Sequence, residues 1–199
     1  MSIEAFPLNQ ICDILTGFQF RGKVEPDPTG KLAVIQMKDF LTEDKIIFDE
    51  KKLTRIKENA FSEKYIVRKN DVLVCGRGLK NFAVLIKKDM NNTIAASQFY
   101  ILRDFKQSVS PGYVAAFLNL PKTQRVITTL RGGTGTQILN SKALGEIPIK
   151  LPELDIQHII AKLFVLEQTE KMILKQLQIK HENLINNILE NAMEGKRHE

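Results

Sequence analysis

The sequence predicts an α+β protein, in which a mixed, β-rich globular domain precedes one long C-terminal α-helix. Two observations predict this class. Short apolar runs bounded by turn residues fill the first three quarters of the chain. From Ile156 to Asn191 there is neither proline nor glycine, and apolar residues recur at helical intervals. We therefore expect a globular domain at residues 1–152 and a helical region at residues 153–199.

The globular part is predicted as many short elements. Asn, Asp and Gly residues flank four β-rich runs, which are predicted as strands at 33–37, 71–75, 82–86 and 94–102. Ser110 followed by Pro111 indicates a helix start, with the serine as the cap. Pro121 ends that helix or begins the next one. A short helical turn at 141–145 stops at a glycine, and 147–149 returns to an extended form.

The C-terminal helix is predicted to carry an apolar stripe. About 36 residues of helix would span ~54 Å, which is longer than a domain of this size can cover. The stripe therefore favours a partner helix, although His181 lies on it and Glu170 lies beside it. The alternative is an amphipathic helix that lies along its own domain. The predicted interface residues are Ile156, Ile160, Leu163, Leu166, Ile173, Leu177, Leu184 and Ile188.

The charge is unevenly distributed. The chain has 199 residues and a net charge of +6, but residues 1–150 carry 23 basic against 15 acidic side chains, whereas residues 151–199 carry 6 against 8. A basic excess confined to the globular part favours a polyanionic partner, with plain solubility as the alternative. Two cysteines, no signal peptide and no apolar run of ~18 residues favour a cytoplasmic protein without a membrane span.

Catalytic motifs are not found. The three histidines, His158, His181 and His198, all lie in the C-terminal region, so no spacing resembles a zinc site. The glycine-rich stretch at 131–137 has no Gly-Lys-Ser/Thr ending, and a lone Gly-x-Gly at 76–78 is weak evidence for a dinucleotide site. We therefore expect a protein without catalytic residues, metal or cofactor.

Three stretches combine arginine with glycine, and we call them glycine segments 1 (21–23), 2 (76–81) and 3 (131–137). Glycines let the backbone approach a phosphate, and arginine and glutamine side chains can pair with guanine and adenine edges. Nucleic-acid contact is therefore favoured over three incidental surface turns. The candidate contact residues are Arg21, Lys23, Lys38, Arg77, Lys80, Asn81, Arg131, Thr134, Thr136 and Gln137, of which Arg77, Asn81, Arg131 and Gln137 are the candidates for base edges.

An ordered series of segments resembles a known family. It resembles a target-recognition domain, with its following conserved helix, of the DNA-specificity (S) subunit of type I restriction-modification systems. The proline followed by Gln-x-Ile-x-Ala at the helix start is the most specific part. The segments are 17–22 (GFQFRG), 34–39 (VIQMKD), 65–74 (YIVRKNDVLV), 76–78 (GRG), 97–99 (SQF), 111–119 (PGYVAAFLN), 133–138 (GTGTQI), 147–152 (IPIKLP) and 157–161 (QHIIA).

The resemblance implies a non-catalytic subunit that reads a few base pairs of double-stranded DNA and is bound by methyltransferase (M) and restriction (R) subunits. In that family the long helix packs antiparallel on its counterpart and spaces two recognition domains. This chain has one domain and one helix, so it resembles a half-subunit. A homodimer through the helix would read a bipartite, inverted-repeat target. A heterodimer or a truncated remnant is the alternative. Outside this family, a protein-interaction module or a fragment of a methyltransferase or nuclease stays open.

Overall fold

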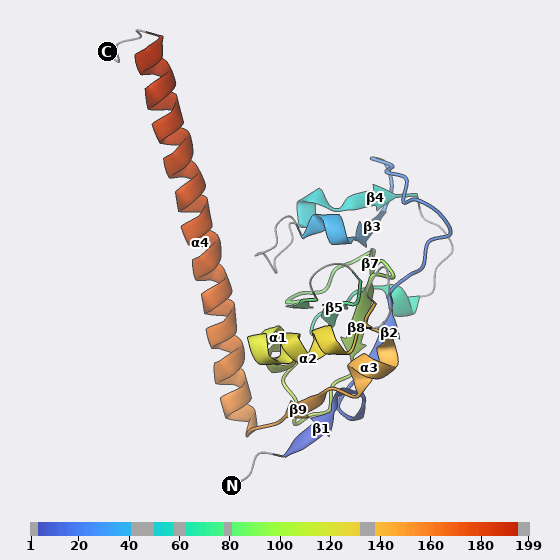
Figure 1. Ribbon diagram of the computed structural model, residues 1–199. Helices are drawn as coiled ribbons and strands as arrows, with labels where there is room; N and C mark the ends of the chain where they lie inside the picture. Colours follow the sequence, from blue (N-terminus) through green and yellow to red (C-terminus); the bar gives the residue numbers. More distant parts are fainter. Residues whose placement is uncertain (1–3, 41–49, 58–62, 78–80, 132–137, 195–199) are drawn as a thin grey trace. The chain divides into compact units, whose positions relative to one another are not determined.

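The computed structural model describes residues 4–40, 50–57, 63–77, 81–131 and 138–194. The chain divides into two units, Met1–Lys162 and Leu163–Glu199. Unit 1 contains every strand and the three shorter α-helices, whereas unit 2 is the greater part of one long helix (Figure 1). An α+β fold with a long C-terminal helix is confirmed.

Two main sheets form unit 1. Each strand of the central sheet pairs antiparallel with its neighbour, while β3 and β7 of the outer sheet pair in parallel. A third, two-stranded sheet joins the start of the chain to the segment before the long helix. The central sheet has the order β2 (Asp13–Thr16), β8 (Phe99–Arg103), β5 (Val72–Cys75), β6 (Ala83–Leu85); the outer sheet has β4 (Thr54–Ile56), β3 (Leu32–Ile35), β7 (Thr93–Ala95); the third pairs β1 (Ala5–Pro7) with β9 (Pro148–Lys150).

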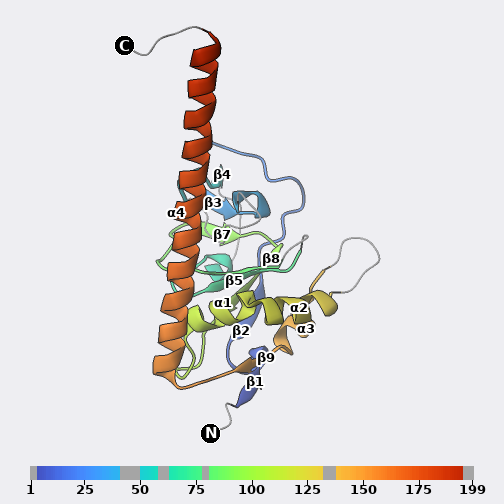
Figure 2. The same ribbon diagram turned by 60° about the vertical axis from the view of Figure 1, so that its left-hand side comes forward.

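Successive side chains of β5 point to opposite faces of the central sheet, and this explains why unit 1 is built in layers. Val72 and Val74 face the helices, whereas Leu73 and Cys75 face the outer sheet, and all four are buried. A strand that is apolar on both faces must be covered on both sides. The outer sheet, the central sheet, the helices and the β1–β9 pair follow one another in the same order in two views (Figures 1 and 2).

The helices begin where the sequence predicts. α1 (Pro111–Asn119) has Pro111 in its first turn, and Tyr113 N donates to Ser110 Oγ at 3.4 Å. α2 begins at Pro121, so that proline both follows one helix and starts the next. The short helix predicted at 141–145 and the extended segment predicted at 147–149 are also confirmed. The remaining helices of unit 1 are α2 (Pro121–Thr129), α3 (Ser141–Gly145), η1 (Leu8–Gln10), η2 (Met37–Asp39), η3 (Glu50–Lys52) and η4 (Glu63–Tyr65).

The apolar run at 94–102 is not one strand, and this prediction is wrong. A turn closed by Phe99 N donating to Ala96 O at 2.9 Å divides it into β7 and β8. β7 pairs with β3 in the outer sheet, and β8 pairs with β5 and β2 in the central sheet. Ser97 and Gln98, two polar residues that are only partly buried, lie at this turn, and the residues on both sides of them are apolar because each strand is buried in its own sheet.

A buried ion pair connects the end of β8 to the segment before β5. Arg103 Nε and Nη2 donate to the two carboxylate oxygens of Asp71 at 2.8 and 2.6 Å. The same guanidinium donates to the carbonyl oxygens of Lys64 and Ile66 at 3.0 and 2.6 Å. These four hydrogen bonds satisfy a side chain that is only 5% exposed, so protein groups replace the water that the charge loses on burial.

The long helix, α4 (Leu154–Met193), is attached to unit 1 by its first turns. Gln157 is 1% exposed, and its Oε1 accepts from Ser110 N at 2.9 Å. Its Nε2 donates to Ser108 O at 2.9 Å and to Pro152 O at 2.8 Å. These contacts explain why the compact unit extends to Lys162, ten residues beyond the expected boundary at 152.

Candidate nucleic-acid interface

The first residues of glycine segment 2, Gly76 and Arg77, contact the two residues that follow glycine segment 3, Ile138 and Leu139. Arg77 forms an antiparallel β-bridge with Ile138. Leu139 N donates to Gly76 O at 3.0 Å, and Tyr100 Oη donates to Leu139 O at 2.8 Å. Two stretches that lie far apart in the sequence are therefore joined by backbone contacts at one edge of the central sheet.

Cys75 brings a second element to the same place. Its Sγ donates to Arg77 O at 2.8 Å and lies 3.0 Å from Met37 Sδ, so η2 is held against the end of β5. η2 has a capping box, in which Gln36 N donates to Asp39 Oδ2 at 2.7 Å. Lys38 lies in this short helix and is exposed. We call the surroundings of Gly76 and Arg77, with η2 and Ile138, the β5-end site.

Two arginine charges influence the pKa values of side chains at the β5-end site. Burial raises the pKa of the Cys75 thiol to about 11, against the hydrogen bond to Arg77 O and the charge of Arg131, which both lower it. Burial also raises the pKa of Tyr100, against the lowering effect of the Arg77 charge. Together with Lys38, these arginines make the β5-end site cationic, which is the charge that a phosphate backbone requires.

Asn81 departs from its expected role. Its side chain is 6% exposed, and Nδ2 donates to Cys75 O at 2.6 Å. The amide therefore closes the connection between β5 and β6, instead of presenting a free edge at the surface. Glycines nearby in the sequence suggested exposure, but the contact with the Cys75 carbonyl buries the side chain. We remove Asn81 from the base-contact candidates.

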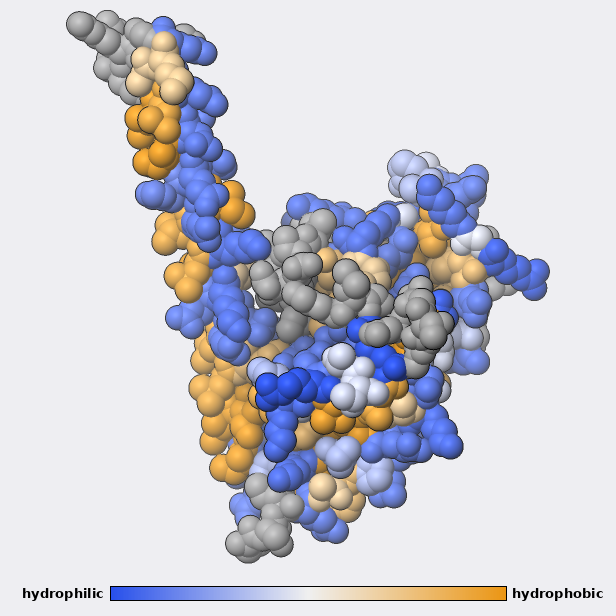
Figure 3. All heavy atoms as spheres, in the orientation of Figure 1, coloured by the Kyte–Doolittle hydropathy of each residue, from blue (hydrophilic) through white to orange (hydrophobic). Residues whose placement is uncertain are grey.

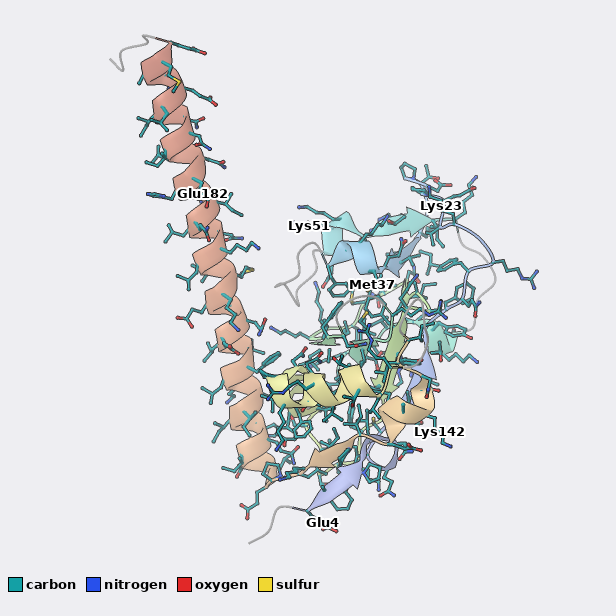
Figure 4. All side chains as sticks on the ribbon, in the orientation of Figure 1. Glu4, Lys23, Met37, Lys51, Lys142 and Glu182 are labelled. Carbon is teal, nitrogen blue, oxygen red and sulfur yellow. The ribbon has the colours of Figure 1, made fainter. Side chains whose placement is uncertain are left out.

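Glycine segment 1 follows β2 but lies apart from the β5-end site. Phe20 and Val24, on either side of it, pack against the cluster of Leu32, Val34 and Ile56, whereas Met37 and Cys75 belong to the cluster on the other face of β3. β2 ends at Thr16 and β5 at Cys75, and β8 begins between them at Phe99. After β2 the chain packs onto the outer sheet, since Phe18 N donates to Ala95 O at 2.7 Å. Arg21 and Lys23 follow and are exposed, and Figure 4 shows Lys23 near β4.

The remaining candidates, Lys80, Thr134, Thr136 and Gln137, lie outside the described residues.

Two glutamines at this edge were not selected from the sequence. Gln36 Nε2 and Gln98 Oε1 are buried and have no hydrogen-bond partner within the described part of the chain. Backbone bonds from Ala96 N to Ile35 O and from Gly76 N to Gln98 O place both glutamines close to the end of β5. Buried polar atoms without a partner are rare in folded proteins and require an explanation. Both residues lie in segments that carry the family resemblance, which is the signal that could have identified them.

The stripe on α4 is exposed at seven of the eight predicted positions: Ile156, Leu163, Leu166, Ile173, Leu177, Leu184 and Ile188. Leu166 is 64% exposed, and an apolar band follows the helix (Figure 3). Ile160 differs, because it is half-buried against the core of unit 1. Three more exposed apolar residues, Ile159, Leu174 and Ile185, lie on the same face and follow from the same periodicity.

The described segments offer no sign of metal or membrane chemistry. They hold no group of three or more His, Cys, Asp or Glu side chains that could bind a metal ion. No described helix is long and apolar enough to cross a lipid bilayer.

Comparisons with known proteins concern the whole chain. The family model described as "Type I restriction modification DNA specificity domain" matches residues 2–183. No curated protein matches the sequence significantly. One similar solved structure, from work on complex assembly and conformational transition of the type I R-M system, has a TM-score of 0.67 at 19% identity, and covers 98% of this chain and 46% of that chain.

Two further solved structures have the same fold. The HsdS subunit from Thermoanaerobacter tengcongensis gives a TM-score of 0.60 at 20% identity, covering 98% of this chain and 45% of that one. The type I restriction-modification S subunit from M. genitalium gives a TM-score of 0.56 at 18% identity, and the match covers 89% of this chain and 42% of that chain. The chain therefore spans just under half the length of these relatives. Because the family model covers most of the sequence, the chain belongs to the family of type I restriction-modification DNA specificity domains.

Proposed function

We propose that the chain is the sequence-reading half of a type I specificity subunit, and that it has no catalytic step of its own. The observation that carries this proposal is that Arg77, Ile138 and the lysine-bearing helix η2 come together at the cationic β5-end site. The family match supports double-stranded DNA as the polyanion.

Contacts at the site divide into two kinds. Lys38, together with Lys80, Arg21 and Lys23, would hold phosphates and position the duplex. Arg77 and Arg131 approach base edges, where a guanidinium can make a bidentate pair with guanine. Gln36 Nε2 and Gln98 Oε1, which have no partner within the described residues, could complete the polar contacts.

The exposed apolar face of α4 supports dimerisation. The chain covers just under half of each similar structure, and α4 exposes an apolar face over its 40 residues, about 60 Å. An antiparallel pair of such helices would hold two recognition units apart and would read two half-sites separated by more than one turn of DNA. Methyltransferase and restriction subunits would assemble on this frame, as the resemblance implies.

Paired variants test the DNA interface. The chain is first assembled with the methyltransferase subunit of the same system. Duplexes that this complex binds are selected from a random pool, and their affinities are measured over a range of salt concentrations. Arg131→Ala should cost about 1–3 kcal/mol at one base position. Lys38→Ala should weaken binding to every duplex and reduce the salt slope by about one.

The matched control is Lys142→Ala. Lys142 is also an exposed lysine, but it lies on α3, in a different part of unit 1 from Met37 (Figure 4). Its replacement should leave affinity and slope as they are. If the variants at 38 and 131 behave like this control, the β5-end site does not contact DNA.

Charges on the stripe test dimerisation. Leu177→Glu together with Leu184→Glu places unpaired carboxylates in the proposed interface, and the cost of burying them should leave only monomers. Mass in solution, measured by light scattering, reports the result. Asn183→Glu on the opposite side of α4 is the control and should remain dimeric. Equal masses for both proteins would contradict the paired helix.

A further inference from the structure

Two polar residues interrupt the exposed apolar face of α4. Glu170 and His181 are both exposed, and their spacing places them along the same face as Leu166, Leu177 and Ile188. We define the α4 seam as the series of ten exposed residues that follow one another along this face at intervals of three or four. They are Ile159, Leu163, Leu166, Glu170, Leu174, Leu177, His181, Ile185, Ile188 and Ala192.

The spacing of the α4 seam is palindromic. Its successive intervals are four, three, four, four, three, four, four, three and four residues, which is the same sequence in both directions. The midpoint falls between Lys175 and Gln176. A repeat of eleven residues in three turns keeps such a seam on one side of a nearly straight helix. The polar positions obey the same symmetry, since Glu170 and His181 are equally far from the midpoint.

Palindromic spacing is a requirement of one kind of interface. In a two-fold antiparallel pair, residue i contacts residue j of the other copy, and j contacts i. We propose that α4 pairs with α4 of a second copy of this chain, in the register that places Glu170 against the partner's His181. The proposal rests on the dimer put forward above and specifies both its partner and its register.

In this register each apolar residue of the α4 seam faces an apolar residue of the partner, and each polar residue faces a polar one. Leu174 faces the partner's Leu177, Leu166 faces the partner's Ile185, and Leu163 faces the partner's Ile188. Ile159 meets the partner's Ala192. The two Glu–His pairs lie about 16 Å apart, one on each side of the two-fold axis. An imidazole N–H can donate to a carboxylate in either protonation state of the ring, so both polar groups obtain a partner.

The polar pairs select the register. A slip of four residues sets Glu170 against the partner's Leu177 or Ile185, which buries a carboxylate without a hydrogen bond. A single polar position inside an apolar helix seam is a known means of specifying alignment. A different partner chain would not require Glu170 and His181 to lie at equal distances from the midpoint, so this placement favours a second identical copy.

Charge exchange across the α4 seam tests the register in the full-length chain. His181→Glu places two carboxylates opposite each other twice in the dimer and should raise the dimer Kd by about 10-fold or more. Glu170→Lys alone should also weaken the dimer. The double variant Glu170→Lys/His181→Glu re-creates two opposite-charge pairs and should return the Kd to within about 3-fold of the original. Sedimentation over a range of concentrations measures all three.

Off-seam variants and cross-linking complete the test. Glu190→Lys and Asn183→Glu make the same charge changes on the opposite side of α4 and should leave the Kd unchanged. A Leu163→Cys copy mixed with an Ile188→Cys copy should form a disulfide on oxidation, whereas Leu163→Cys with Leu177→Cys should not. The native thiols, Cys12 and Cys75, are buried.

The outcomes separate this inference from the function on which it rests. A dimer that Leu177→Glu and Leu184→Glu abolish, but that charge exchange does not rescue, keeps the dimer and overturns the register. A wild-type chain that stays monomeric at every concentration overturns both. If charge exchange restores the dimer but the wild-type dimer does not bind DNA, the DNA proposal alone is overturned.

Discussion

At the scale of single residues, Gln157 shows how a short motif produces a fixed geometry. Its amide joins three backbone groups on both sides of the α4 start, and Gly112 completes the fit. A Cβ on Gly112 would lie 3.0 Å from the Ala161 Cβ. The Gln-x-Ile-x-Ala segment therefore does two things: its glutamine and alanine fasten the helix to unit 1, while its first isoleucine, Ile159, stays exposed for the α4 seam.

Gln157→Glu tests this role with almost no change of shape. The new carboxylate can still accept from Ser110 N, but it cannot donate to the carbonyl oxygens of Ser108 and Pro152, which would then face a buried charge. We expect the free energy of unfolding of unit 1 to fall by about 2–4 kcal/mol, measured by urea denaturation. The neighbouring exposed His158→Ala should stay within about 0.5 kcal/mol of the original. Equal stability of the two variants would show that these hydrogen bonds are dispensable.

Sequence patterns identified local features and missed those that depend on distant partners. The Ser110 cap and Pro111 define α1 without outside help. The role of Asn81 was misjudged, because only the folded chain brings the Cys75 carbonyl to its amide. The three bonds of Gln157 to positions up to 49 residues away are equally invisible to periodicity. The contact between Arg77 and Ile138 also required the tertiary structure.

At the scale of elements, the crossing between the two sheets depends on close backbone contact. Gly17 follows β2 and passes over the turn between β7 and β8, where Gly17 N donates to Phe99 O at 2.9 Å. A Cβ at this position would lie 2.4 Å from Ala96 O and 2.6 Å from Ala95 O. A single strand was predicted at 94–102 because the apolar residues at its two ends do not reveal which sheet each end joins.

Gly17→Ala should therefore loosen this crossing. The obstructing atoms are backbone oxygens, so the turn itself must move, and we expect a loss of about 1–3 kcal/mol or more in the free energy of unfolding. Hydrogen exchange should accelerate at the amides of Gly17 and Phe18 before it does in α1. Gly22→Ala is the control, since no atom lies within 4 Å of the position that its Cβ would take. Matching stabilities for the two variants would argue against a tight crossing.

At the scale of the whole molecule, the two units divide the proposed work. Within the described residues, the hydrophobic clusters consist of residues up to Ile160, so the core of unit 1 forms without the rest of α4. The α4 seam beyond Lys162 contributes nothing to those clusters and instead presents apolar side chains to solvent. Stability and dimerisation should therefore be separable.

A chain that ends after Lys162 puts this separation to the test. Its urea midpoint should match that of unit 1 in the full-length protein, because every core residue is retained. Its mass should be that of a monomer. On a duplex with two half-sites its affinity should fall by about 10²–10⁴-fold, since the second unit no longer binds as part of the same molecule. On a duplex with one half-site its affinity should stay the same. The full-length Leu177→Glu/Leu184→Glu variant should reproduce both results, which would assign the loss to the broken pair and not to missing residues. Undiminished affinity of the short chain for the two-part duplex would mean that one unit reads its target without help from a second.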